Sequence, residues 1–199
     1  MKRRDRFRRI CLGSRWRERI VLPGGRELLL RPIDPADLAP IRDGFVLLYP
    51  EEVRLRYLHA VKALDDDYLR KLVRPRRGLD FVLVLAEPLP PGEALVGAVA
   101  RFSRPSGARD AEFAILVSHF LSGHGLGHLL LRKLIERARR CGLSSLYGDV
   151  LAENAPMLRL ADALGFARQA SDEPGTVRVR RTFAARQVAD VADTGARLG

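Results

Sequence analysis

The segment from residue 111 to residue 141 constrains the fold of this chain more than any other. Residues 111–117 form an apolar stretch of strand length, and residues 126–141 carry apolar side chains at helical spacing. Gly123-His124-Gly125-Leu126-Gly127 joins them. A glycine-rich turn that enters a helix offers backbone N–H groups and the positive end of the helix dipole to an anion. The pattern therefore indicates a site for a phosphate group.

Other glycine-rich phosphate loops match this turn less well. No Lys-Ser or Lys-Thr pair follows the glycines, which disfavours a P-loop. The glycines alternate, whereas a dinucleotide-binding loop has the spacing G-x-G-x-x-G within an early β-α-β unit. Coenzyme A, a dinucleotide, a nucleoside triphosphate or a tight turn without a ligand all stay open at this point.

The rest of the pattern predicts one α+β domain. A Pro-Gly-Gly turn separates two apolar runs at 19–22 and 27–31, which is typical of a β-hairpin. The spacing of apolar residues predicts short helices between 38 and 73, the last one capped by acidic residues at 65–67. We expect further strands at 81–87, 94–102, 111–117, 146–151 and 176–183, and helices at 126–141 and 155–164. This order favours a mixed, mostly antiparallel sheet flanked by helices.

The positive charge lies mainly at the N-terminus. Of 35 Lys and Arg, 11 fall in residues 1–31 against three acids, and the net charge of the whole chain is +11. We expect residues 1–19 to be a basic, flexible leader, residues 20–183 to be the folded domain and residues 184–199 to be a flexible tail. Such a leader can make weak contacts with nucleic acid or another acidic surface.

The sequence shows no pattern typical of a membrane span, a secretory signal or a metal site. No apolar run reaches the roughly 18 residues of a membrane span, and the arginine-rich N-terminus is unlike a secretory signal, so we expect a cytoplasmic protein. Two cysteines are too few for a disulfide framework or a zinc site. His119, His124 and His128 surround the glycine loop without a convincing metal-ligand spacing, so we predict no metal.

Several motifs in a fixed order narrow the choice of ligand. Val117 precedes the loop that begins at Ser122, Glu153-Asn154 precedes a helix, and Leu164-Gly165-Phe166 ends that helix. In this order the chain resembles the GCN5-related N-acetyltransferase (GNAT) superfamily over roughly residues 20–183. Arg54-Leu55-Arg56-Tyr57 and Ala111-Glu112-Phe113-Ala114 are similar to the acetyltransferase domain of bacterial Pat-type protein lysine acetyltransferases. The resemblance implies a splayed strand pair that holds acetyl-CoA as cosubstrate.

The resemblance also implies roles for named residues. Ile115 and Val117 are expected to offer backbone groups to the pantetheine arm, and Asn154 to contact the cofactor or to cap its helix. The pyrophosphate is expected to bind at Ser122, Gly123, His124, Gly125, Leu126 and Gly127. Ser122 stands where relatives carry Gln or Arg, which removes a charged contact. Because backbone amides form most of the cradle, we expect weaker binding at worst.

Glu112 is the predicted general base. A lysine amine, with a pKa near 10.4, must lose a proton before it attacks a thioester, and a nearby carboxylate can accept that proton directly or through water. We expect Glu112 to lie among apolar neighbours on the strand that leads to the cofactor. Many relatives place a tyrosine general acid at the position of Ala161. A thiolate leaves readily from a thiol of pKa near 8.5, so this acid is dispensable.

Three functions follow from these expectations. The first is transfer of an acetyl group from acetyl-CoA to a primary amine, with a protein lysine as the expected acceptor. The second is acetylation of a small-molecule amine. The third belongs to another class: a non-catalytic acyl-CoA-binding sensor or adaptor, whose basic leader contacts a partner.

Overall fold

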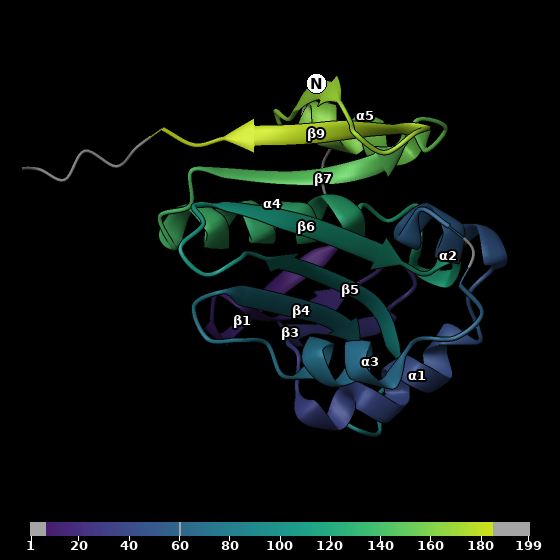
Figure 1. The fold of residues 1–199 in the computed structure, drawn as a ribbon. Helices are drawn as coiled ribbons and strands as arrows, with labels where there is room; N and C mark the ends of the chain where they lie inside the picture. The colour runs from purple at the N-terminus through teal and green to yellow at the C-terminus, as the bar shows by residue number, and fades with distance from the viewer. Residues whose placement is uncertain (1–6, 60, 185–199) are drawn as a thin grey trace, which may run out of the picture.

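Nine strands form a single sheet in the computed structural model, which describes residues 7–59 and 61–184. The strands are β1 Arg8–Ser14, β2 Arg17–Val21, β3 Glu27–Pro32, β4 Asp80–Ala86, β5 Val96–Ser103, β6 Asp110–Val117, β7 Ser145–Leu151, β8 Ala167–Ala170 and β9 Thr176–Thr182. Their order across the sheet is β1-β2-β3-β4-β5-β6-β7-β9-β8, and only β6 and β7 pair in parallel. The predicted mixed, mostly antiparallel sheet is confirmed (Figure 1).

Five α-helices cover the two faces of this sheet. They are α1 Leu38–Phe45, α2 Pro50–Tyr57, α3 Asp66–Val73, α4 Leu126–Arg140 and α5 Ala155–Ala163, with short 3-10 turns η1 Pro35–Asp37 and η2 His119–Leu121. Each predicted helix and strand has a counterpart within a few residues. As predicted, an acidic residue caps α3, because the Asp65 carboxylate accepts a hydrogen bond from the Tyr68 amide.

Alternate side chains along the central strands serve two separate cores. Leu83, Ala100 and Phe113 lie in the larger core with α4 and α5, whereas Val82 and Val99 lie on the opposite face with α1 and α3. Because strand side chains alternate between faces, Glu112 and Leu116 project to the α1–α3 side, away from α4. This alternation decides which side chains can meet an acceptor.

The first strand corrects the predicted extent of the flexible leader. Arg8–Ser14 pairs with β2 as the edge of the sheet, so order begins well before residue 19. Sequence patterning missed β1 because an edge strand exposed on both faces carries no alternation of apolar and polar residues. The short exposed strand β8 was missed for the same reason. Residues 1–6 of the predicted leader and 185–199 of the predicted tail lie outside the described residues.

A buried ion cluster fastens the N-terminal strands to α4. Glu18 accepts hydrogen bonds from Arg9 at 2.6 and 2.8 Å and also pairs with Lys133. Lys133 donates to the carbonyl oxygen of Arg15 at 2.5 Å, and its side chain is 6% exposed. Lys133 is buried although the neighbouring Arg132 is exposed, because the β1–β2 hairpin covers that position. Arg9 and Arg15 form ion pairs with Glu18 and Glu136 of the same chain. Contact of the leader with nucleic acid stays a prediction.

Candidate functional site

The site begins where β6 and β7 stop pairing. The two strands pair only from Asp110 to Glu112 on β6, and Figure 1 shows them diverging towards α2. Gly148 stands at the divergence: a Cβ there would lie 3.0 Å from the carbonyl oxygen of Phe113. A side chain at this position would therefore collide with the neighbouring strand. The separation leaves one edge of β6 open along 113–117.

The direction of the backbone along this open edge follows from its pairing with β5. Ser118 donates its amide to the carbonyl oxygen of Gly97, so it faces β5, and antiparallel pairing makes alternate residues do the same. Ile115 and Val117 consequently direct their N–H and C=O groups into the cleft. Contact of these two positions with a pantetheine arm stays a prediction.

The glycine loop leads from η2 into α4, and its last residue, Gly127, lines the same cleft. Gly123 and Gly125 have φ values of +78° and +84°, which residues other than glycine rarely adopt. Gly125 is the N-cap of α4, and the first amides of the helix point outward without intrahelical partners. Ser122, His124 and Leu126 complete the turn, in which the Nδ1 atom of His124 lies 3.3 Å from the carbonyl oxygen of Leu121.

Gly127 falls within the helix predicted at 126–141. It lies inside the first turn of α4, where an added Cβ would come within 3.4 Å of the Leu160 side chain and 4.0 Å of Val117. A small residue here lets α4 pack closely against α5 and keeps the cleft open. Its amide is still among the first of the helix.

Helix α5 forms the side of the cleft opposite β6, as the positions of Asn154 and Ala161 show. The Asn154 side chain accepts from the Met157 amide at 3.1 Å, so it is an N-cap, and it also lines the cleft. Ala161, where many relatives carry a tyrosine, is fully buried in the core. The cleft wall on this helix is instead apolar, formed by Met157 and Leu160.

The cleft between these elements has a volume of about 410 Å³. Its wall includes Glu112, Ile115, Leu116, Val117, Gly127, Gly148 and Asn154, with Glu52, Leu55, Arg56, Tyr57 and Leu58 from α2 and its end. Glu112 is exposed, which corrects the expectation of an apolar enclosure. It lies on the sheet face opposite the large core, and solvent reaches it through the cleft. The predicted base therefore borders one cavity with Ile115, Val117, Gly127 and Asn154, whereas residues 122–126 of the glycine loop are not part of its wall.

Helix α2 spans this cleft, which the sequence did not reveal. Glu52 accepts the His119 amide at 2.5 Å and lies 3.0 Å from Nδ1 of the same residue, on the β6 side. Arg54 forms an ion pair with Glu153, which precedes α5 on the β7 side. Both pairs join residues far apart in sequence, so no local pattern could have identified them.

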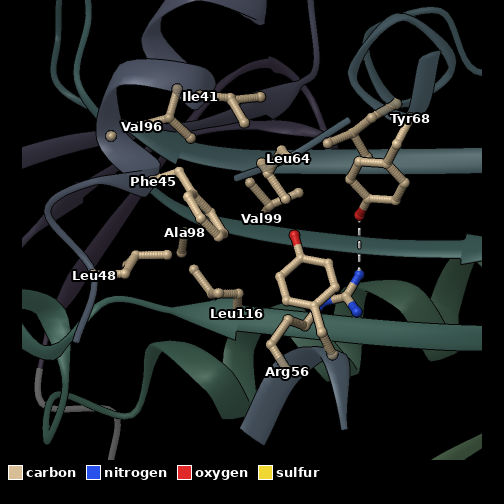
Figure 2. Close-up of a pocket in the computed structure, with 13 residues that line it drawn as sticks. Ile41, Phe45, Leu48, Arg56, Leu64, Tyr68, Val96, Ala98, Val99 and Leu116 are labelled. Carbon is tan, nitrogen blue, oxygen red and sulfur yellow. Dashed lines mark hydrogen bonds between the residues drawn. The ribbon is translucent and has the colours of Figure 1, made fainter. Parts of the chain in front are cut away.

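A second, smaller cavity of about 40 Å³ lies beside the cleft, beneath α1, α2 and α3 (Figure 2). Its wall is mostly apolar and shares Arg56, Tyr57 and Leu116 with the cleft. Burial is the largest of the influences that raise the pKa of Tyr57 well above its ordinary value, and nearby Tyr68 adds to it. The phenol is therefore neutral at physiological pH.

Comparison with known proteins agrees with this geometry. A family model described as an acetyltransferase (GNAT) domain matches residues 27–167, which is more than half of the chain. The chain belongs to the GNAT acetyltransferase family. The chain is also 29% identical over 171 residues to Acetyltransferase PA5475 of Pseudomonas aeruginosa, covering 85% of this chain and 89% of that protein.

The fold of the chain is similar to those of two solved structures. The GNAT domain of S. lividans PAT has a TM-score of 0.73 and 21% identity, over 87% of this chain and all of that one. The yncA acetyltransferase of Salmonella typhimurium, solved with acetyl-CoA, has a TM-score of 0.60 and 24% identity, over 82% of this chain and 98% of that one. At these identities the two structures establish the fold.

The residues present suit an acyl-CoA cosubstrate. The open edge of β6 can pair with an extended amide-bearing arm, and the N-terminus of α4 can hold its pyrophosphate. The acetyltransferase is accordingly dependent on acyl-CoA. In the described part of the chain no three His, Cys, Asp or Glu side chains group as metal ligands. No helix in that part is long and apolar enough to cross a membrane.

Proposed function

We propose that this acetyltransferase transfers an acetyl group from acetyl-CoA directly to a primary amine, with Glu112 as general base. The observation that carries the proposal is that Glu112 and the open edge at Ile115 and Val117 border one cleft. When bound, acetyl-CoA supplies the activated acyl group. The protein holds it on β6 and α4 and presents the carboxylate on the acceptor side.

Glu112 can take up the proton that the amine must lose. Its carboxylate forms no ion pair within the described residues, so it is available to an incoming ammonium group. Its exposure allows a water molecule to relay the proton. The leaving thiolate needs no acid because its thiol has an ordinary pKa near 8.5. This agrees with the buried alanine at position 161.

A protein lysine is the acceptor that we propose first. The likeness of the Arg54–Tyr57 and Ala111–Ala114 sequence motifs to Pat-type enzymes supports it. A lysine side chain is long enough to reach a base inside a cleft, while the rest of the acceptor stays outside. A small-molecule amine is the alternative, and a cytoplasmic location stays a prediction.

The decisive experiment is incubation of the purified protein with labelled acetyl-CoA and either a cell lysate or a panel of small amines. Label on mapped protein lysines supports the first acceptor class, whereas label only on small amines supports the alternative. If acetyl-CoA binds and no amine is acetylated, the proposed enzymatic function is wrong and a sensor or adaptor takes its place.

A further inference from the structure

Within residues 7–59 and 61–184, two arginines near Glu112 have no acidic partner: Arg56 lines the cleft, and Arg101 lies behind its wall on β5. Arg56, on α2, donates to the Tyr68 hydroxyl at 3.3 Å, and its guanidinium carbon lies 4.7 Å from the centre of the Tyr57 ring (Figure 2). Arg101, on β5, lies 5.4 Å from the centre of the Tyr68 ring. Both side chains are partly buried. Both guanidinium groups also act electrostatically on the Tyr57 phenol, so they belong to one cluster.

Among the other buried or partly buried arginines, Arg104 and Arg181 donate to backbone carbonyl groups and Arg137 lies over aromatic rings, whereas others pair with carboxylates. Arg31 pairs with Asp37, Arg178 with Asp149 and Arg180 with Asp110. Across residues 7–59 and 61–184, no carboxylate forms an ion pair with Arg56 or Arg101. Positive charge that lies beside aromatic rings and a hydroxyl, with no paired carboxylate among the described residues, favours the arrival of an anion.

The sheet register places this cluster next to the predicted base. Arg101 pairs with Ala114, which stands between Glu112 and Leu116 on the same face of β6. Same-face neighbours on a strand are separated by about 7 Å, roughly the length of one side chain. An acceptor whose amine lies at Glu112 therefore extends its neighbouring groups towards the two arginines.

The surroundings strengthen such a contact. Arg56 lines both the cleft and the apolar cavity, whose labelled walls in Figure 2 include Phe45, Val99 and Leu116. Charge pairing is stronger beside apolar walls than in open water. A planar guanidinium also matches a carboxylate through two parallel hydrogen bonds.

We propose that Arg56 and Arg101 bind a carboxylate of the acceptor, so that the enzyme selects amines that carry a carboxylate close to the reacting nitrogen. This inference rests on the proposed acetyl transfer at Glu112. A free amino acid and a peptide, through an acidic neighbour or a C-terminus, can both supply this group. Arg56 and Arg101 are specificity-determining residues, and proton transfer stays with Glu112.

The test compares acceptors that differ only in the carboxylate. One arm uses leucine against 3-methylbutylamine, and a second uses a peptide with a C-terminal lysine as free acid against its amide. A third uses lysine peptides flanked by glutamate against glutamine. In at least one arm we expect kcat/KM to be about 10- to 100-fold higher with the carboxylate, the range of a charge-assisted contact. The arm that shows the preference identifies the source of the carboxylate.

Arg56→Met and Arg101→Met remove the charge and keep an unbranched side chain that can fill most of the space of the arginine stem. We expect each to raise the KM for the preferred acceptor about tenfold with little change in kcat, and to leave the KM for acetyl-CoA unchanged. Arg101→Lys should restore part of the preference. Arg70→Met, at an exposed position on α3, is the matched control and should behave as wild type. Thermal unfolding of every variant separates loss of binding from loss of fold.

Two results overturn the proposal while leaving acetyl transfer intact. They are equal kcat/KM with and without the carboxylate in all three arms, and an unchanged preference in both methionine variants. If no amine is acetylated, acetyl transfer itself fails. In that case, calorimetry measures whether N-acetylleucine or the acetylated peptide acids bind to the protein in the presence of CoA. This binding tests the carboxylate site without acetyl transfer. Binding that Arg101→Met weakens about tenfold supports the site, and the absence of binding refutes it.

Discussion

Glu112 lies where the pairing of two strands ends and the cleft begins. It lies at the last pairing of β6 with β7, on the face opposite α4, and it borders the cleft. Glu112→Gln retains the shape of the side chain and removes the proton acceptor. We expect kcat to fall about 10²- to 10⁴-fold while the KM for acetyl-CoA stays nearly constant. Steady-state kinetics test this, with exposed Glu173→Gln as control. An undiminished kcat would exclude Glu112 from proton transfer.

Gly125 shows how one backbone angle can support a binding loop. At a φ of +84°, alanine is strained by about 1 kcal/mol and disturbs the first amides of α4. Gly125→Ala should therefore lower stability and raise the Kd for acetyl-CoA, as measured by calorimetry. Gly107→Ala meets a similar φ of +78°, away from the cleft, and should lower stability alone. An equal loss of affinity in both variants would contradict a binding role for the loop.

At the scale of elements, the divergence of β6 and β7 depends on the contact between Gly148 and Phe113. Gly148→Ala forces a Cβ to within 3.0 Å of a backbone oxygen, so the strands must shift where they separate. We expect a loss of about 1–3 kcal/mol in the free energy of unfolding. We also expect weaker binding of acetyl-CoA, because the open edge moves. Urea unfolding and calorimetry measure the two effects. Unchanged affinity in a destabilised variant would show that the cleft does not depend on this contact.

At the scale of the whole molecule, Glu18 links the N-terminal strands to α4. Burial acts to raise the pKa of Glu18, but hydrogen bonds from Arg9 and Lys133 outweigh it and hold the pKa below its ordinary value of 4.5. The resulting stability is present above pH 4.5 and is lost as the pH falls through the lowered pKa. Glu18→Gln should cost about 3 kcal/mol at pH 7, because it leaves Lys133 buried without its counter-charge.

The same variant has a signature in its pH dependence. Below pH 4.5 the difference in unfolding free energy between wild type and Glu18→Gln should shrink, because wild-type Glu18 becomes protonated there. Urea unfolding between pH 3 and pH 7 measures this difference. Glu18→Leu combined with Lys133→Met should recover much of the stability, since apolar groups of similar size can replace a buried ion pair. A difference that stays constant with pH would refute the ionic linkage.

Local patterns in the sequence were enough to locate the helices, most of the strands and the glycine loop. Apolar periodicity places α4 and the central strands within a few residues, because it depends on local spacing, and the run of glycines marks the turn that enters α4. Edge strands β1 and β8 lack such patterning, since neither face of them is buried.

Contacts between residues far apart in the sequence could not be predicted, because they depend on how the segments pack. Lys133 is buried because a hairpin more than 100 residues earlier covers it, and Arg54 reaches Glu153 because α2 spans the cleft. Arg56 and Arg101 come from separate elements, so their shared lack of an acidic partner exists only in three dimensions. Local patterns report local burial and backbone angles. The pairing of charges depends on packing between segments, and in this acetyltransferase that packing shapes the acceptor side of the cleft.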